Sequence, residues 1–173
     1  LRLADTLVET GRPHDALEVY QGLIGARQSG IAAEALFSSA RVLRDLARQQ
    51  RRAADMSAAE KNLKEARRRL KRLVLLYSFE QLAPLPQRAW LELAELEAET
   101  ERTDAAIAAL NDLIEAFPES PHALYARARA DQLRGRPNEA EVHLRKLKAH
   151  DQPLPDELAQ DVARLTRELE ARR

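Results

Sequence analysis

The chain has 173 residues, of which 45% are hydrophobic and 4% aromatic, and its 28 Lys and Arg residues balance its 28 Asp and Glu residues. A neutral net charge gives no global field that attracts nucleic acid or anionic lipid, and no apolar run approaches the roughly 20 residues that span a bilayer. The absence of cysteine excludes disulfides, thiolate catalysis and zinc–thiolate sites. An Ala-, Leu-, Arg- and Glu-rich chain with only 5 Gly residues predicts an all-helical protein.

A motif of the form Gly-Arg-Pro-x-acid-Ala occurs twice, at Gly11–Ala16 and at Gly135–Ala140. Glycine can end one helix in a left-handed conformation, and proline can open the next helix. The first copy therefore predicts one helix over residues 3–10 and its partner over 13–26, with residues 28–30 as the connector. Because the pattern from Leu1 to Ala4 is typical of the middle of a helix, we expect the chain to be a segment of a larger protein.

The second unit is unusually long. Helical spacing of apolar residues predicts a helix from about residue 32 to about residue 55. Ser57 and Glu60 then form a capping-box pattern, which predicts the start of the next helix. The apolar stripe of that helix is Leu63, Ala66, Leu70, Leu73 and Tyr77. The extra length indicates either a solvated helical hairpin, which we favour, or a protruding contact element.

The C-terminal half repeats with an offset of 34 residues. After a proline-containing connector at 82–86, helices are predicted over 87–100, 103–117, 121–134 and 137–150. A last helix from residue 155 either caps the array or begins a further repeat. In this register Trp90, Leu93, Ala94, Ala106, Leu110, Leu113 and Pro118 align with Leu124, Arg127, Ala128, Ala140, Leu144, Leu147 and Gln152. Paired amphipathic helices with this period indicate a helical repeat array.

These positions resemble the tetratricopeptide repeat (TPR) family. Trp90 stands at the large aromatic position, Leu93-Ala94 at the Leu–small pair, Ala106 at the contact between helices and Pro118 at the closing proline, whereas Arg127 and Gln152 depart from the pattern. The resemblance implies an all-α, right-handed solenoid of stacked antiparallel helix hairpins, extended in the second repeat. The expected units are 1–28, 31–80, 87–120 and 121–152, with a terminal helix over 155–172.

The resemblance also implies a function. We expect a non-enzymatic scaffold that binds a peptide or partner protein in a concave groove lined by the first helix of each hairpin. The turn at residues 117–121 is similar to one in bacterial cell-envelope members of the family, and favours the envelope or periplasm over the cytoplasm. The family pattern places six residues where relatives contact ligands: Phe37, Arg41, Leu91, Glu95, Tyr125 and Arg129. Phe37 and Tyr125 are equally compatible with a place in the core.

Charge is unevenly distributed along the chain. Residues 41–72 contain twelve basic and four acidic residues, whereas residues 80–119 contain ten acidic and two basic ones. This pattern predicts self-association through the two segments, or an acidic partner at a basic hairpin that includes Arg51, Arg52, Arg67, Arg68 and Arg69. Nucleic acid is disfavoured, because aromatic residues are not interleaved with the basic ones and the neighbouring acidic segment repels phosphate.

Signals of catalysis are weak. The sequence has no nucleophile elbow, phosphate-binding loop or metal motif. His143 and His150 lie two helical turns apart, which is too far to share a metal easily. Glu92, Glu95 and Glu99 share one helical face and are interpreted as a solvated or partner-facing stripe. We therefore predict no catalytic residue, metal or cofactor; the alternative is an accessory domain of a larger enzyme or regulator.

Overall fold

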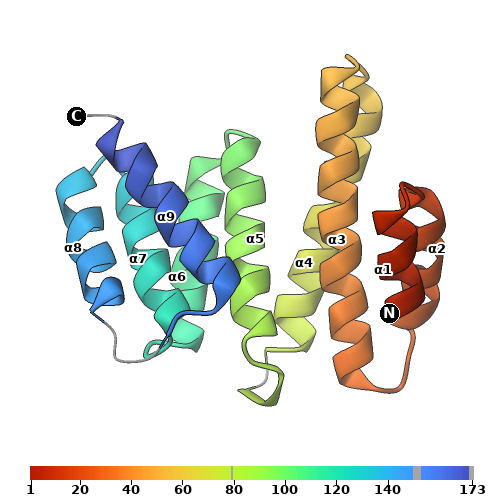
Figure 1. Ribbon diagram of the computed structural model, residues 1–173, viewed down its shortest axis with the longest axis horizontal. Helices are drawn as coiled ribbons and strands as arrows, with labels where there is room; N and C mark the ends of the chain where they lie inside the picture. Colours follow the sequence, from red (N-terminus) through yellow and green to blue (C-terminus); the bar gives the residue numbers. More distant parts are fainter. Residues whose placement is uncertain (79, 150–152, 172–173) are drawn as a thin grey trace. The chain divides into compact units, whose positions relative to one another are not determined.

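The computed structural model describes residues 1–78, 80–149 and 153–171, and within these ranges the regular structure is helical, without a strand (Figure 1). This confirms the all-α prediction. The chain divides into two compact units, Leu1–Leu96 and Glu97–Arg173. In unit 1 the first four helices pack in sequence order, each against the next, and in unit 2 the last four helices do the same.

Unit 1 begins with α1 (Arg2–Glu9) and α2 (Pro13–Ile24), followed by α3 (Ser29–Arg52) and α4 (Met56–Leu76). A short 3-10 helix, η1 (Glu80–Leu82), then leads into α5 (Leu85–Glu99), most of which belongs to this unit. Helix α2 packs against both α1 and α3, and α3 packs along α4. Between α1 and α2, the Tyr20 hydroxyl donates a hydrogen bond of 2.5 Å to Asp5.

Unit 2 contains the end of α5, then α6 (Thr103–Ala116), α7 (Pro121–Leu133), α8 (Pro137–Lys148) and α9 (Asp156–Glu170). Helix α7 packs against α6 and α8, and α9 contacts both α7 and α8. The aligned position Gln152, the residue His150 and the last residue of the expected terminal helix lie outside the described residues.

Helices α1, α3, α5 and α7 each end in the same type of turn. In α7, the Gly135 N–H donates to the Gln132 carbonyl at 3.0 Å, and the Arg136 N–H donates to the Asp131 carbonyl at 2.8 Å. These two bonds form a Schellman motif, which requires a left-handed residue. The left-handed residues of the four turns are Gly11 (φ 75°), Ala54 (62°), Glu101 (60°) and Gly135 (73°). The prediction for the two glycines is confirmed, and two further non-glycine residues adopt the same conformation.

Small residues lie at the helix crossings. Ala106 in α6 and Ala140 in α8 are fully buried, as the repeat register predicts. Ala16 in α2 and Ala66 in α4, which occupy the same aligned position, are also fully buried. A methyl group at these positions lets two helix backbones approach closely, and each second helix from α2 to α8 carries one.

Two predicted helix starts are wrong. The capping box at Ser57 and Glu60 does not form, because Asp55 is the N-cap of α4 and its side chain accepts the Ala58 N–H at 3.0 Å. The turn that ends α3 places Asp55 there, so α4 begins at Met56. The predicted connector 28–30 is likewise wrong, because α3 begins at Ser29 after the N-cap Gln28.

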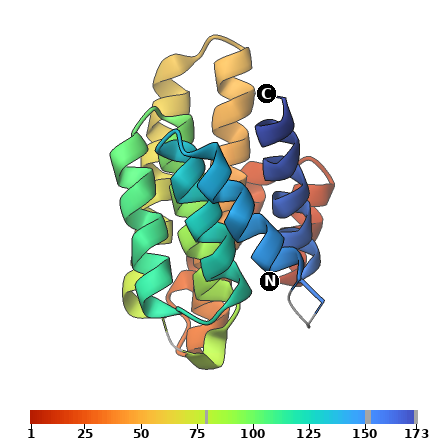
Figure 2. The same cartoon turned by 90° about the vertical axis from the view of Figure 1, so that its left-hand side faces the viewer.

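The hairpin of α3 and α4 is the longest in the described structure. These helices have 24 and 21 residues, compared with 12 in α2. They extend well beyond the end of α1 and α2 (Figure 1). Figure 2 shows the same extension from the side. The predicted stripe on α4 is buried as far as Leu73, whereas Tyr77 is the C-cap of the helix and only half-buried.

Candidate interaction surfaces

In unit 1, α3 and α5 carry four of the six predicted groove residues. Phe37 on α3 is buried, with 4% of its surface exposed. The guanidinium carbon of Arg41 lies 5.8 Å from the ring centroid, and that of Arg88 on α5 lies 4.7 Å from it. Both distances fall within the range of cation–π attraction. The aromatic ring therefore positions two guanidinium groups, of which that of Arg41 belongs to an exposed residue.

A partly buried ion pair joins the same two helices. The Arg44 guanidinium donates a hydrogen bond of 2.5 Å to the Glu92 carboxylate, and their side chains are 7% and 21% exposed. Charge-assisted hydrogen bonds between partly desolvated groups are strong and directional. This pair therefore fixes the register of α3 against the first part of α5, beside the ring of Phe37.

The remaining groove candidates in unit 1 differ in accessibility. Leu91 is buried, with 7% of its surface exposed, whereas Glu95 is half-buried. Neither Phe37 nor Leu91 presents much apolar area to a partner in this structure. The side chains that a partner could reach here are charged.

In unit 2, Tyr125 and Arg129 lie one turn apart on α7. Tyr125 is buried with 2% of its surface exposed. Arg129 is half-buried; it forms an ion pair of 3.3 Å with Glu168 of α9 and donates a hydrogen bond to Gln132. Gln132 in turn donates to Glu168 at 2.8 Å. Helix α9 thus supplies a carboxylate at the position where we expected a ligand to meet Arg129.

The basic hairpin residues have different environments. Arg51 and Arg52 are exposed at the end of α3. On α4, Arg67 is half-buried, whereas the side chain of Arg68 is 77% exposed and forms an ion pair of 2.8 Å with Glu65. These four guanidinium groups remain candidates for contact with an acidic partner.

Arg69 has a structural role instead. It is 9% exposed, and it donates to Glu65 at 2.9 Å and to Gln21 of α2 at 3.2 Å. Burial raises the pKa of Glu65, but hydrogen bonds from Arg68 and Arg69 more than offset this, so the pKa lies below its ordinary value. Arg69 therefore ties α4 to α2 and is poorly placed to contact a partner.

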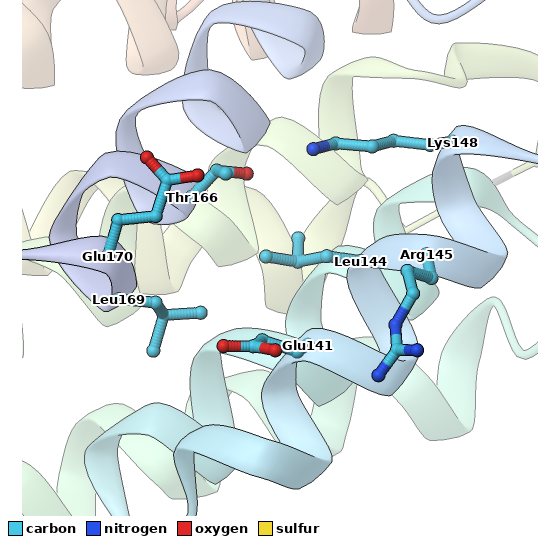
Figure 3. A pocket seen from close by; sticks show the side chains of 7 residues that line it. All are labelled: Glu141, Leu144, Arg145, Lys148, Thr166, Leu169 and Glu170. Carbon is cyan, nitrogen blue, oxygen red and sulfur yellow. The ribbon is translucent and has the colours of Figure 1, made fainter. Parts of the chain in front are cut away.

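A small depression lies between α8 and α9 (Figure 3). Its volume is about 160 Å³, below the range of about 300–1,000 Å³ typical of small-molecule sites. Leu144 and Leu169 provide its apolar part, and Lys148 extends toward Thr166 across it. The other lining residues are Glu141, Arg145 and Glu170. The mixed charges and small volume do not indicate a cofactor site.

Asp131 is the centre of a charged cluster between α7 and α8. It is 7% exposed, accepts a hydrogen bond from Arg136, and lies 3.6 Å from Arg134 and 3.4 Å from His143. Burial lowers the pKa of His143, although the charge of Asp131 acts in the opposite direction. His143 Nδ1 is buried with no hydrogen-bond partner among the described residues, so protonation there would leave an unsatisfied donor.

Neither metal sites nor membrane spans are evident in the part of the chain that the structure describes. No group of three or more His, Asp or Glu side chains there is arranged to hold a metal ion. None of the helices formed by residues 1–78, 80–149 and 153–171 combines the length and apolar character that a bilayer span requires.

Two family models, both described as tetratricopeptide repeat, match residues 1–62 and residues 87–130. The chain belongs to the tetratricopeptide repeat family. Members of this family generally serve as protein–protein interaction modules. A comparison with curated proteins gave no match.

Two solved structures with a TM-score of 0.57 support the fold of this tetratricopeptide protein. The nearly identical TPR-like repeats assigned to a kinesin light chain of Podosopora anserina share 18% identity over 99% of this chain and 85% of that chain, with a TM-score of 0.57. A single-substitution variant of the same repeats gives 17% identity, 98% and 91% coverage, and a TM-score of 0.57. The MamA protein shares 20% identity over 90% of this chain and 76% of that chain, with a TM-score of 0.48.

The repeat register extends into α9. Leu158, which is buried, follows Leu124 by the same 34 residues that separate Leu124 from Trp90. Helix α9 also contacts both α7 and α8, which is the packing expected of either a cap or the first helix of a further repeat.

Sequence reasoning missed three side-chain contacts that organise these surfaces. Arg88 lies on Phe37, Arg44 pairs with Glu92, and Arg69 bonds to Gln21, and each contact joins residues about 50 positions apart. Periodicity placed all six on helices but cannot pair residues between helices. The tetratricopeptide pattern indicated that α3 and α5 are first helices, which was the one available signal.

Proposed function

We propose that this chain is a non-enzymatic scaffold that binds a peptide or a partner protein along the first helices of its hairpins, through Phe37, Arg41, Leu91, Glu95, Tyr125 and Arg129. The observation that carries the proposal is the cation–π contact of exposed Arg41 with buried Phe37. The ring restricts the guanidinium group before a partner arrives, so less side-chain entropy is lost on binding.

In this proposal the six residues have different roles. Phe37 and Leu91 act as a rigid floor in unit 1, and Tyr125 does so in unit 2, because little of their surface is exposed. Arg41 and Glu95 make the direct contacts, and arginine is among the residue types that dominate binding hot spots. A partner segment with a carboxylate for Arg41 and a donor for Glu95 suits this arrangement.

Arg129 already has a carboxylate partner within the chain, which limits how it can bind a ligand. Its guanidinium is ion-paired with Glu168 of α9, so a ligand carboxylate must replace or share that contact. Glu168→Gln should therefore strengthen the binding of an acidic peptide by removing an intramolecular competitor. No gain in affinity from that variant would remove Arg129 from the proposed site.

The experiment selects peptides from a random library on the wild-type chain and measures their affinity by fluorescence anisotropy. Arg41→Ala and Glu95→Ala should each weaken binding about tenfold or more, which is the range of a moderate hot spot. Arg27→Ala is the matched control, because Arg27 is an exposed arginine in the loop before α3. Equal affinity for the wild type and both groove variants would refute the proposed site.

A second candidate is an acidic partner at the basic hairpin. It is favoured by the extension of α3 and α4 beyond their neighbours and by the exposure of Arg51 and Arg52. Arg51→Glu combined with Arg52→Glu should abolish such binding, and added salt should weaken it steeply. Selected peptides that depend on these two residues, and not on Arg41, would replace the groove proposal with this one.

A further inference from the structure

The outer face of α4 is a basic stripe. Its members are all exposed: Lys61, Lys64, Arg68, Lys71 and Arg72. Helical spacing places them on one side of α4, opposite the buried stripe that includes Ala66 and Leu70. The stripe ends at Leu75, which is 78% exposed. Of these side chains, that of Arg68 is bound to Glu65 within the same helix.

The outer face of α6 is an acidic stripe. Asp104, Asp112 and Glu115 are exposed and lie opposite the buried Ala106 and Leu110. No Lys or Arg occurs between residues 103 and 121. Although Asp112 is exposed, partial desolvation raises its pKa, and the nearby charge of Glu115 raises it further. A basic partner on this face would relieve that repulsion.

The two stripes match in length and spacing. Lys61 to Arg72 and Asp104 to Glu115 each span eleven residue steps, or about 16 Å at the α-helical rise. When the helices are aligned antiparallel, Lys61 meets Glu115, Lys64 meets Asp112 and Arg72 meets Asp104. Ala108 then faces Arg68, whose guanidinium already has a partner. The parallel alignment brings only two oppositely charged pairs together, at Lys61–Asp104 and Arg72–Glu115.

We propose that two copies of this chain associate through these faces, with α4 of one copy antiparallel to α6 of the other. A second copy is the occupant because each copy carries both complementary stripes and because a neutral chain has no long-range repulsion toward itself. Antiparallel helix dipoles also attract. The contact does not depend on the peptide site proposed above.

Sedimentation velocity at increasing concentration tests the proposal. In about 20 mM NaCl the weight-average mass should rise above the 19.5 kDa of one chain, and in about 500 mM NaCl it should return toward that value because salt screens exposed charges. A chain that stays at 19.5 kDa in low salt at the highest concentration reached would overturn the proposal.

Charge reversal identifies the surfaces. Lys61→Glu with Lys64→Glu, and separately Asp112→Lys with Glu115→Lys, should each weaken association about tenfold or more, because two attractions become repulsions. Mixing the two reversed variants should restore association, since each reversed stripe then meets an opposite charge. Arg51→Glu with Arg52→Glu is the control, because it changes the net charge by the same amount as the α4 reversal.

Two further results would overturn the proposed pairing of α4 with α6. A mixture that stays monomeric, or a control that weakens association as much as the α4 reversal, would show that these faces are not paired. Circular dichroism of every variant establishes that the helices are intact, so loss of association cannot be attributed to unfolding.

Discussion

The left-handed turns allow a direct comparison of two residues in equivalent places. Gly135 and Glu101 both end a first helix, with φ of 73° and 60°. A Cβ built on Gly135 meets no heavy atom within 4 Å, so Gly135→Ala changes backbone preference without a steric clash. The side chain of Glu101 is exposed. Stability differences at these positions should therefore report the conformation alone.

The magnitudes follow from two opposing effects. The left-handed conformation costs an L-residue about 1–2 kcal/mol, and replacing Gly with Ala recovers about 0.4–1 kcal/mol through the unfolded chain. Gly135→Ala should therefore destabilise by about 1 kcal/mol. Glu101→Gly should stabilise by about 0.5–1 kcal/mol. Glu101→Ala, which keeps the unfavourable conformation, should change stability by less than about 0.5 kcal/mol.

Urea unfolding followed by circular dichroism at 222 nm measures these differences. The m-value is compared between variants, because repeat arrays do not always unfold in one step. Each kcal/mol corresponds to a shift in Tm of about 2–4 °C for a chain of this size. Unchanged stability in both Gly135→Ala and Glu101→Gly would show that the turns do not carry the assigned strain.

Three further predictions concern buried contacts. Ala106→Leu and Ala140→Leu should each destabilise by about 1–3 kcal/mol through overpacking, and an unchanged Tm for either would show that the repeat register is wrong. Arg44→Ala should lower the free energy of unfolding in urea by about 2 kcal/mol, because Glu92 is left partly buried without its partner. A decrease below about 0.5 kcal/mol would show that the ion pair contributes little to stability. Burial lowers the pKa of His143 in the folded chain, so as pH falls this histidine is protonated in the unfolded chain before it is protonated in the folded one. The free energy of unfolding should therefore decrease as pH falls through the ordinary range of histidine titration. His143→Gln should lose less stability than wild type between about pH 7 and pH 5, and parallel curves would contradict this.

Local signals predicted the helices well. The Gly-Arg-Pro motifs placed the turns at Gly11 and Gly135, because glycine adopts positive φ without strain. The same 34-residue register aligns Glu101 with Gly135 and Arg102 with Arg136, so the sequence contained a signal for the third turn. It was missed because glutamate is a poor indicator of a left-handed residue.

The incorrect helix starts have physical reasons. The Asp55 N–H completes the turn at the end of α3 by donating to Gln50 at 2.9 Å, and its side chain caps α4. One residue thus serves two helices, which a search for separate caps does not detect. At the start of α3, Ser29 and Gly30 lie in the first turn, where backbone N–H groups have no intrahelical partner and helix propensity matters little.

The candidate site was less predictable than the fold. Family positions identified Phe37, Leu91 and Tyr125, but their burial depends on how neighbouring helices pack, which helical periodicity does not determine. The contact of Glu168 with Arg129 likewise depends on the placement of α9. Charge segregation was visible in the sequence, whereas the matched stripes on α4 and α6 became evident only once the exposed faces were known.

Photo-crosslinking in the source cells can show whether a partner protein binds at the first helices. A photoreactive residue at position 45 replaces the exposed Asp45, one helical turn beyond Arg41 on α3, and a control at position 53 replaces the exposed Ala53 at the hairpin tip. We expect crosslinks from position 45 to another protein that disappear with Arg41→Ala and persist with Arg27→Ala. Crosslinks confined to position 53, or crosslinks at position 45 that are indifferent to Arg41→Ala, would contradict this expectation.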